Sequence, residues 1–280
     1  MGRPSKCSGF DELLDAMQVS IPEILSLLSK EWRVPLNARS VTPVTKGTRT
    51  ASVFAIDGAG LPTVFLKIER DNVADLWAEI QRTKWLGAQG IRVPAVLRTF
   101  YSRDVAAALV AELPGAAPHD CLLPCREIID SLARGMKAIH SLPTARCPFD
   151  ETLPVRLKRA RTLILHNALD EGNFDERNRG LTAQQIYDGL IAAIPQSEQL
   201  VVIHGDPDFR KLRIDPHGEL GFLDCGHAGQ GDRYIDLVCI MTNIAEHFGL
   251  QWLAPFFKSY GMETWDHQRA LFFSDLYNLF

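Results

Sequence analysis

The sequence lacks any apolar segment long enough to cross a membrane. Its longest uninterrupted apolar run covers residues 105–111, whereas a helix that spans a bilayer needs about 20 apolar residues. Residues 1–15 are largely polar or charged and contain no apolar signal-peptide core. Lys6 stands where an N-myristoylation motif requires serine or threonine. These absences predict a cytoplasmic protein with no membrane partner.

An excess of positive charge is also missing. The chain has 30 Lys and Arg residues against 34 Asp and Glu residues, for a formal net charge of −4, whereas nucleic-acid-binding domains usually carry a basic excess. The six cysteines are scattered, and Cys121 and Cys125 form no paired motif of the kind that binds zinc. We therefore expect no nucleic-acid partner, and we expect the thiols to be reduced.

What the sequence does have is the composition of a globular protein. Of its 280 residues, 46% are apolar and 23% are charged, which is close to the average for globular domains and sufficient for two modest cores. The proline- and glycine-containing segment 114–118 interrupts the pattern. We expect two domains, residues 1–113 and residues 114–280, with a hinge between them.

Residues 1–113 combine helical and strand-like patterns. Apolar residues at helical spacing predict helices over residues 11–17, 22–32 and 72–86. Strand-like segments cover residues 40–45, 51–56, 62–69, 95–100 and 105–113. The glycine-containing connector 57–60 predicts a hairpin. We expect an antiparallel sheet with one prominent helix.

Residues 114–280 have a mostly helical pattern. Amphipathic spacing predicts helices over residues 127–142, 155–169, 183–194, 233–248, 251–260 and 265–279. The interruption at residues 200–224 contains short apolar runs that surround polar residues. Candidate functional side chains therefore lie on loops between short strands.

Two aspartates directly follow apolar segments in this interruption. Asp206 follows the run Val201-Val202-Ile203-His204-Gly205, and Asp224 follows Gly221-Phe222-Leu223. Two carboxylates at strand ends could provide a general base and a Mg²⁺ ligand for phosphoryl transfer. Alternatively, both are ordinary turn residues, because aspartate is common where a strand gives way to a turn.

A lysine interrupts an otherwise apolar strand in the first half. A buried ammonium group at Lys67 needs an anionic partner, and Glu79 on the following helix could pair with it to hold nucleotide phosphates. Alternatively, Lys67 protects a sheet edge from aggregation, and Glu79 lies on a solvated face. The upstream loop containing Gly47 and Thr48 could cover phosphates with its amide groups.

The order of these features resembles the aminoglycoside phosphotransferases, and most closely their 3′-phosphotransferase branch. The most similar stretches are residues 147–150 (CPFD), 200–206 (LVVIHGD) and 222–236 (FLDCGHAGQGDRYID). The resemblance implies an α+β, protein-kinase-like fold, with a small antiparallel β-sheet lobe carrying one main helix and a larger, mostly helical lobe. It also implies ATP or GTP, Mg²⁺ and a polycationic aminoglycoside as ligands.

The resemblance further implies a role for each matching residue. Asp206 matches the catalytic aspartate that deprotonates the acceptor hydroxyl, and Asp224 matches the aspartate that binds Mg²⁺. Lys67 and Glu79 match the phosphate-binding ion pair, whereas His204 matches a structural residue. The other expected nucleotide contacts are at Gly47, Thr48, Val110, Glu112 and Leu113.

One departure concerns the metal. The family carries a Mg²⁺-binding asparagine five residues after the catalytic aspartate, and this chain has Lys211 there. An ammonium group has no lone pair with which to bind a cation, so Lys211 would repel Mg²⁺ or contact the phosphates directly. Asp208 is the candidate for the missing oxygen ligand.

The acceptor side also departs from the family. A site for a polycation should be lined with carboxylates, and Asp175, Glu176 and Glu246 could supply them. Alternatively, the acidic run around Asp175 is a solvated loop. The other candidate substrate residues are His227 in place of a usual arginine, Asn243 near family acids, and Phe280 with the terminal carboxylate.

The resemblance and its departures imply three alternative functions. The first is an enzyme that phosphorylates an aminoglycoside and so confers resistance. The second is a kinase-fold protein whose catalysis is weakened or lost through Lys211. The third is a kinase for another small alcohol. Turnover of aminoglycosides with Mg-ATP separates the first function from the other two, and nucleotide binding with and without Mg²⁺ tests the second.

Overall fold

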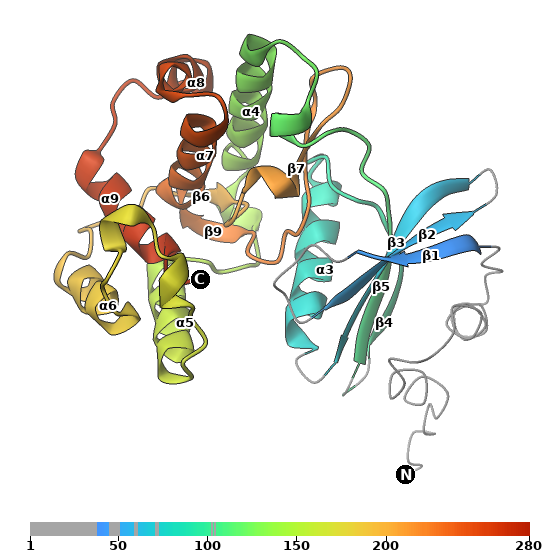
Figure 1. Cartoon of the computed structure of the whole chain (residues 1–280), viewed down its shortest axis with the longest axis horizontal. Helices are drawn as coiled ribbons and strands as arrows, with labels where there is room; N and C mark the ends of the chain where they lie inside the picture. Colours follow the sequence, from blue (N-terminus) through green and yellow to red (C-terminus); the bar gives the residue numbers. More distant parts are fainter. Residues whose placement is uncertain (1–37, 45–50, 59–60, 71–72, 102, 104) are drawn as a thin grey trace. The chain divides into compact units, whose positions relative to one another are not determined.

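The computed structural model describes residues 38–44, 51–58, 61–70, 73–101, 103 and 105–280 (Figure 1). The helices expected over residues 11–17 and 22–32, together with Gly47 and Thr48, lie outside the described residues. Packing divides the chain into two compact units. The first contains the described residues up to Trp77 together with Ala95–Glu112, and the second contains Ala78–Pro94 and Leu113–Phe280. The domain boundary after residue 113 stays a prediction.

A five-stranded antiparallel sheet forms most of the first unit, as the sequence predicted. Its strand order is β1-β2-β3-β5-β4. The strands are β1 (Ala38–Pro43), β2 (Ser52–Gly58), β3 (Leu61–Arg70), β4 (Val96–Tyr101) and β5 (Val105–Ala111). The predicted hairpin joins β2 to β3, with Gly58 opposite Leu61.

The sequence of β5 explains its place inside this sheet. All residues of β5 except the last are buried, and the strand pairs with β3 on one side and β4 on the other. Leu66 and Ala107 are fully buried beside Ile56 in the core of this unit. Buried Glu69 accepts a 2.6 Å hydrogen bond from the amide of Leu76 in the first turn of α3 (Ala74–Ala88).

The second unit is mostly helical, as predicted. Its remaining helices are α4 (Cys125–His140), α5 (Leu153–Leu165), α6 (Ala183–Ala192), α7 (Arg233–His247), α8 (Leu253–Tyr260) and α9 (His267–Tyr277). Two antiparallel pairs of short strands join them: β6 (Leu200–Ile203) with β9 (Gly229–Asp232), and β7 (Leu212–Ile214) with β8 (Leu220–Phe222). Among the described residues, no helix has the length and apolarity needed to span a bilayer.

Several helix ends differ from the sequence prediction for local reasons. Helix α5 begins at Leu153 because Pro154 suits a first turn. It ends before Asn167, which adopts a left-handed φ of 49°, a conformation that asparagine tolerates. The segment expected as one helix from Gln251 instead begins with a 3₁₀ turn, Leu250–Trp252, and only then becomes α8.

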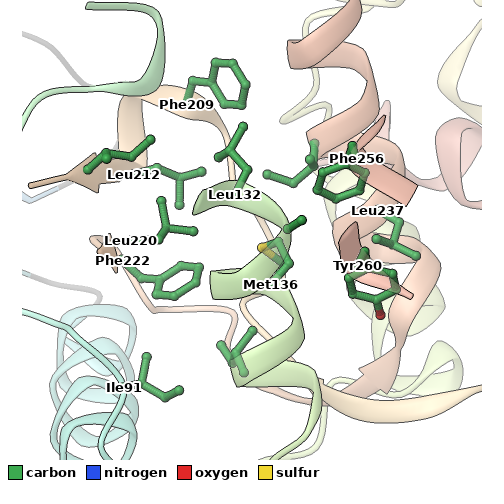
Figure 2. Close-up of a cluster of buried hydrophobic side chains, with 14 of the residues drawn as sticks. Ile91, Leu132, Met136, Phe209, Leu212, Leu220, Phe222, Leu237, Phe256 and Tyr260 are labelled. Atoms are coloured by element: carbon green, nitrogen blue, oxygen red, sulfur yellow. The ribbon is translucent and has the colours of Figure 1, made fainter. Parts of the chain in front are cut away.

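Helix α4 lies at the centre of the main core of the second unit. Figure 2 shows Leu132 and Met136 on α4 beside Leu220 and Phe222 on one side and Phe256 on the other. All except Leu220 are almost fully buried. Gly135 on α4 allows Leu220 of β8 to pack closely against the helix, because a Cβ at this position would overlap the side chain of Leu220. This packing fixes β8, which is directly followed by the loop of Asp224.

The described cysteines behave as the sequence predicted. Cys121, Cys125, Cys147, Cys225 and Cys239 are all free thiols, and the last three are buried. Burial raises the pKa of Cys147 above its ordinary value and the pKa of Cys239 to about 12. These two thiols are therefore protonated at neutral pH and act as small packing residues.

Candidate active site

The loop that carries Asp206 leaves the end of a short buried strand. Strand β6 pairs antiparallel with β9, and the chain then continues as His204-Gly205-Asp206. Gly205 adopts a φ of 89°, and a Cβ at this position would overlap the carbonyl oxygen of His227 and lie 2.6 Å from Arg156 Nη2. Only glycine fits this turn without strain. The geometry therefore explains the glycine between the strand and Asp206.

The buried carboxylate of Asp236 holds this loop in place through hydrogen bonds. The side chain lies in the first turn of α7 and is fully buried. Its two oxygens accept hydrogen bonds from the amide groups of His204 and Gly205, each at 2.7 Å. His140 Nε2 lies 3.1 Å from Asp236 Oδ2. Although burial raises the pKa of Asp236, the hydrogen bond and charge of His140 and the contacts of His204 outweigh it, so the pKa is lowered.

No role for Asp236 was predicted from the sequence. The sequence does show an aspartate near the start of a predicted helix, with apolar residues on either side of it. Such a carboxylate either caps its own helix or serves a distant backbone. Asp232 caps α7 by accepting a hydrogen bond from the Tyr234 amide. The carboxylate of Asp236 therefore serves the amide groups of the loop of Asp206 and not its own helix.

His204 is a buried structural residue, in agreement with the resemblance. Its Nε2 lies 2.8 Å from the carbonyl oxygen of Leu223, and the Asp206 amide donates to its Nδ1 at 3.4 Å. These partners require a neutral ring that carries its proton on Nε2. Burial lowers the pKa of His204 below the ordinary 6.5, which favours the same neutral form. The ring thus joins the loop of Asp206 to the residue before Asp224.

The loop of Asp224 is tied to the loop of Asp206 by the backbone as well. The Leu223 amide donates a 2.7 Å hydrogen bond to the carbonyl oxygen of Lys211. Asp224 itself adopts a left-handed φ of 52°, an uncommon conformation for a residue other than glycine. The two aspartates selected from the sequence therefore lie on loops that are hydrogen-bonded to each other within the second unit.

Both oxygens of the Asp206 carboxylate have partners. Oδ1 accepts a 2.9 Å hydrogen bond from the hydroxyl of Tyr277 at the end of α9, and Oδ2 forms an ion pair with Lys211 Nζ. The side chains of Asp206 and Lys211 are 20% and 18% exposed. The positive charge of Lys211 therefore lies directly beside the carboxylate of the candidate base. The contact with Tyr277 was not predictable from the sequence, because Tyr277 lies 71 residues away along the chain.

The carboxylate of Asp208 is engaged by Arg210. Asp208 Oδ1 accepts from the amide and Nε of Arg210, both at 2.8 Å, and Oδ2 accepts from Nη2 at 3.1 Å. Burial raises the pKa of Asp208, but the hydrogen bonds and charge of Arg210 outweigh this and lower it. The carboxylate of Asp208 therefore caps the 3₁₀ turn Phe209–Lys211. Its role as a metal ligand stays a prediction.

The candidate nucleotide residues are distributed over both units. Lys67 is half-buried on β3 of the first unit, whereas Glu79 lies on the part of α3 that belongs to the second. Val110 is buried on β5, and the Glu112 amide donates to the Thr63 carbonyl at 3.1 Å. Leu113 is buried at the start of the second unit. The nucleotide-binding roles of these residues stay predictions.

The candidate acceptor residues fall into two groups. Glu176 and Glu246 are exposed, and their contact with an acceptor stays a prediction. Asp175 is also exposed, but its carboxylate accepts from the Asn178 amide at 2.9 Å and from Asn278 Nδ2 at 3.0 Å. Asn243 is buried, and its Oδ1 accepts from the Phe209 amide at 3.3 Å. Asp175 and Asn243 therefore support the backbone of this unit.

His227 and Phe280 border a cluster of arginines that the sequence did not reveal. Fully buried Glu151 accepts hydrogen bonds from Arg82 at 2.9 Å and from Arg159 at 3.0 Å. Arg156 Nε lies 3.7 Å from the same carboxylate. The Glu151 cluster thus consists of this glutamate and three guanidinium groups, all within the second unit.

The aromatic ring of Phe280 covers part of the Glu151 cluster. The guanidinium carbons of Arg156 and Arg159 lie 5.5 and 6.0 Å from the ring centroid, within the range of a cation–π contact. Arg159 Nη1 also lies 3.1 Å from His227 Nδ1. Both predicted substrate residues therefore border the Glu151 cluster, in which three guanidinium groups face one carboxylate.

Comparisons with known proteins agree with the resemblance. The profile of the phosphotransferase enzyme family matches residues 40–273. An aminoglycoside 3′-phosphotransferase from Streptomyces ribosidificus is 30% identical over 253 residues, which cover 85% of this chain and 94% of that protein. A protein of the same name from Escherichia coli is 28% identical over 232 residues, covering 81% of this chain and 85% of that protein.

Solved structures extend the agreement to the fold. An aminoglycoside 3′-phosphotransferase of type VIII superposes with a TM-score of 0.81 at 26% identity, covering 97% of this chain and 99% of that one. An aminoglycoside phosphotransferase from Streptomyces rimosus, solved with ADP and streptomycin, gives a TM-score of 0.78 at 25% identity. It covers 94% of this chain and 99% of that one. The predicted α+β, kinase-like fold is thereby confirmed.

Proposed function

We propose that this chain, which belongs to the phosphotransferase enzyme family, transfers the γ-phosphoryl group of ATP to a hydroxyl of an aminoglycoside and so confers resistance. The relatives named for this activity, together with one solved with ADP and streptomycin, support the choice of nucleotide and acceptor. The observation that carries the proposal is the carboxylate of Asp206, which already accepts a 2.9 Å hydrogen bond from a hydroxyl group.

Asp206 acts as the general base. A base must lie about 2.6–3.2 Å from the atom that carries the proton it removes, and the contact with the hydroxyl oxygen of Tyr277 has this length. The two amide hydrogen bonds from the loop to Asp236 support this role, because they hold the loop without using the Asp206 carboxylate. An acceptor hydroxyl that replaces Tyr277 on Oδ1 is oriented and gives up its proton as the phosphorus–oxygen bond forms.

The residues around Asp224 suit a Mg²⁺ ion held jointly with the nucleotide. Mg²⁺ typically takes one or two carboxylates and completes its coordination with phosphates and water. The half-buried carboxylate of Asp224 is the ligand we assign, because Arg210 engages Asp208 and an ammonium group at Lys211 has no lone pair. When bound, the ion neutralises charge on the phosphates. On the first unit, Lys67 is the residue we assign to nucleotide phosphates, as a point charge.

The acceptor is held by exposed acids of the second unit. Glu176 and Glu246 are exposed, whereas the exposed carboxylate of Asp175 accepts hydrogen bonds from Asn178 and Asn278. We therefore assign the two glutamates to the amino groups of the aminoglycoside.

A kinase for a less basic alcohol is the second candidate function. The Glu151 cluster favours it, because the guanidinium groups of Arg156 and Arg159 beside Phe280 oppose a polycation there.

Steady-state turnover tests the proposed function. The purified chain is assayed with Mg-ATP against kanamycin, neomycin and streptomycin, and the phosphorylated product is identified by mass spectrometry. We expect phosphorylation of at least one of the three, and we expect charge reversal at Glu246→Lys to raise KM more than it lowers kcat. Turnover of neutral alcohols alone would select the second candidate.

A further inference from the structure

Among the described hydrogen bonds, only that from the Tyr277 hydroxyl reaches Asp206 Oδ1. An acceptor hydroxyl would therefore have to displace Tyr277 from this oxygen. The Tyr277 hydroxyl donates to this oxygen at 2.9 Å. This is the distance expected between a base and the oxygen atom whose proton it removes. A tyrosine hydroxyl in this position is chemically an alcohol presented to the catalytic carboxylate of a phosphotransferase.

The surroundings keep this hydroxyl protonated and in place. Burial raises the pKa of Tyr277 well above its ordinary value, so loss of the proton requires a base in contact with it. The thiol of Cys239 donates to the same hydroxyl oxygen at 3.7 Å. The end of α9 is held by Asn278, whose side chain makes two hydrogen bonds with Asp175, at 2.7 and 3.0 Å.

We propose that Tyr277 is a self-phosphorylation site, at which the chain transfers the γ-phosphoryl group of ATP to its own hydroxyl when no acceptor is bound. The inference rests on the proposed function, because it uses the same base and the same nucleotide. Asp206 Oδ1 takes the proton of Tyr277 Oη, and Oη forms a bond to the γ-phosphorus. The bond from that phosphorus to the β–γ bridging oxygen breaks, and ADP leaves with its electron pair.

The product would change the site in a defined way. A phosphotyrosine carries a charge of about −1.5 to −2 at neutral pH, and it would lie beside the ammonium group of Lys211, which is already paired with Asp206. The added phosphate would occupy the acceptor position on Asp206 and pair with Lys211. Self-phosphorylation would therefore lower turnover of an external acceptor.

Self-phosphorylation is tested by incubating the full-length chain with Mg-ATP alone and mapping the phosphate by peptide mass spectrometry. We expect one phosphate per chain at Tyr277, accumulating at a rate that does not depend on protein concentration. Asp206→Asn should abolish this product, and Tyr277→Phe should remove the label. Tyr101→Phe is the matched control, because Tyr101 on β4 is 51% exposed and its substitution should leave labelling of Tyr277 unchanged.

The outcomes separate this inference from the proposed function. Absence of phosphate at Tyr277 would overturn the inference, as would labelling of Tyr277 that persists in Asp206→Asn or a phosphate found at other residues instead. An aminoglycoside assay on the same preparation reports on the proposed function independently. Turnover of an aminoglycoside without label on Tyr277 would leave the proposed function intact and refute self-phosphorylation alone.

Discussion

Replacing Asp236 by asparagine should destabilise the second unit far more than an ordinary surface substitution. The buried carboxylate accepts two amide hydrogen bonds at 2.7 Å. The asparagine side chain has nearly the same shape but only one acceptor oxygen, so one amide of the loop loses its partner. Its NH₂ group would then face an N–H donor.

The size of the effect follows from these contacts. A hydrogen bond to a charged group contributes about 1.5–3 kcal/mol, and a buried donor left without a partner costs about 1–3 kcal/mol. Because His140 and the remaining amide keep some of their contacts, we expect Asp236→Asn to lower the free energy of unfolding by about 3 kcal/mol. Turnover should fall as well, since the loop of Asp206 loses its support.

Urea unfolding followed by circular dichroism measures the change. Asp130→Asn is the matched control, because Asp130 also accepts hydrogen bonds, from Arg126 at 2.8 Å and Ser259 at 2.6 Å, but its side chain is 27% exposed. We expect the control to change the free energy of unfolding by less than about 1 kcal/mol. An Asp236→Asn variant as stable as the control would refute the reasoning.

Three further substitutions test other parts of the site. Lys211→Asn frees Asp206 and supplies an oxygen ligand, so turnover should rise several-fold and depend more steeply on Mg²⁺; equal or lower turnover would show that Lys211 assists the reaction. Gly205→Ala should abolish turnover and destabilise the chain more than Gly180→Ala, because both glycines have a positive φ but only Gly205 meets atoms within 4 Å of a Cβ. Equal effects of the two would contradict the close approach. Burial lowers the pKa of His204, so below pH 6.5 the unfolded chain binds a proton that the folded chain does not. The free energy of unfolding should therefore fall on acidification, by up to about 1.4 kcal/mol per pH unit, and His204→Gln should remove this part of the slope in urea melts at pH 7.5, 6.5 and 5.5.

The sequence was sufficient to find residues whose role depends on local pattern. Asp206 and Asp224 each follow a short apolar strand, and the glycine before Asp206 marks a turn that only glycine fits. The sheet of the first unit was predictable for the same reason, because its strands are short segments rich in β-branched and apolar residues and β2 pairs with the next strand along the chain, β3.

Residues whose role depends on distant partners were not predictable in this way. Asp236 is 32 residues from the His204 amide that it binds, and Tyr277 is 71 residues from Asp206. Glu151 lies 69 residues from Arg82. A buried carboxylate and an exposed one look alike in a sequence until packing decides which of them is desolvated.

Lys211 illustrates the same difference. The sequence left two possibilities for its ammonium group, repulsion of Mg²⁺ or contact with the phosphates. The structure adds a third partner, the carboxylate of Asp206, which is only five residues away. This contact depends on the 3₁₀ turn Phe209–Lys211, which is capped by Asp208. No periodicity in the sequence indicates so short an element.

The most direct test of the central assignment is the turnover number of Asp206→Ala, measured with saturating Mg-ATP and an aminoglycoside that the unmodified chain phosphorylates, alongside the dissociation constant for ATP. If Asp206 is the base, kcat should fall by a factor of about 10² to 10⁴, while the affinity for ATP and the unfolding midpoint stay nearly unchanged. Turnover retained within a few-fold of the unmodified chain would contradict the assignment.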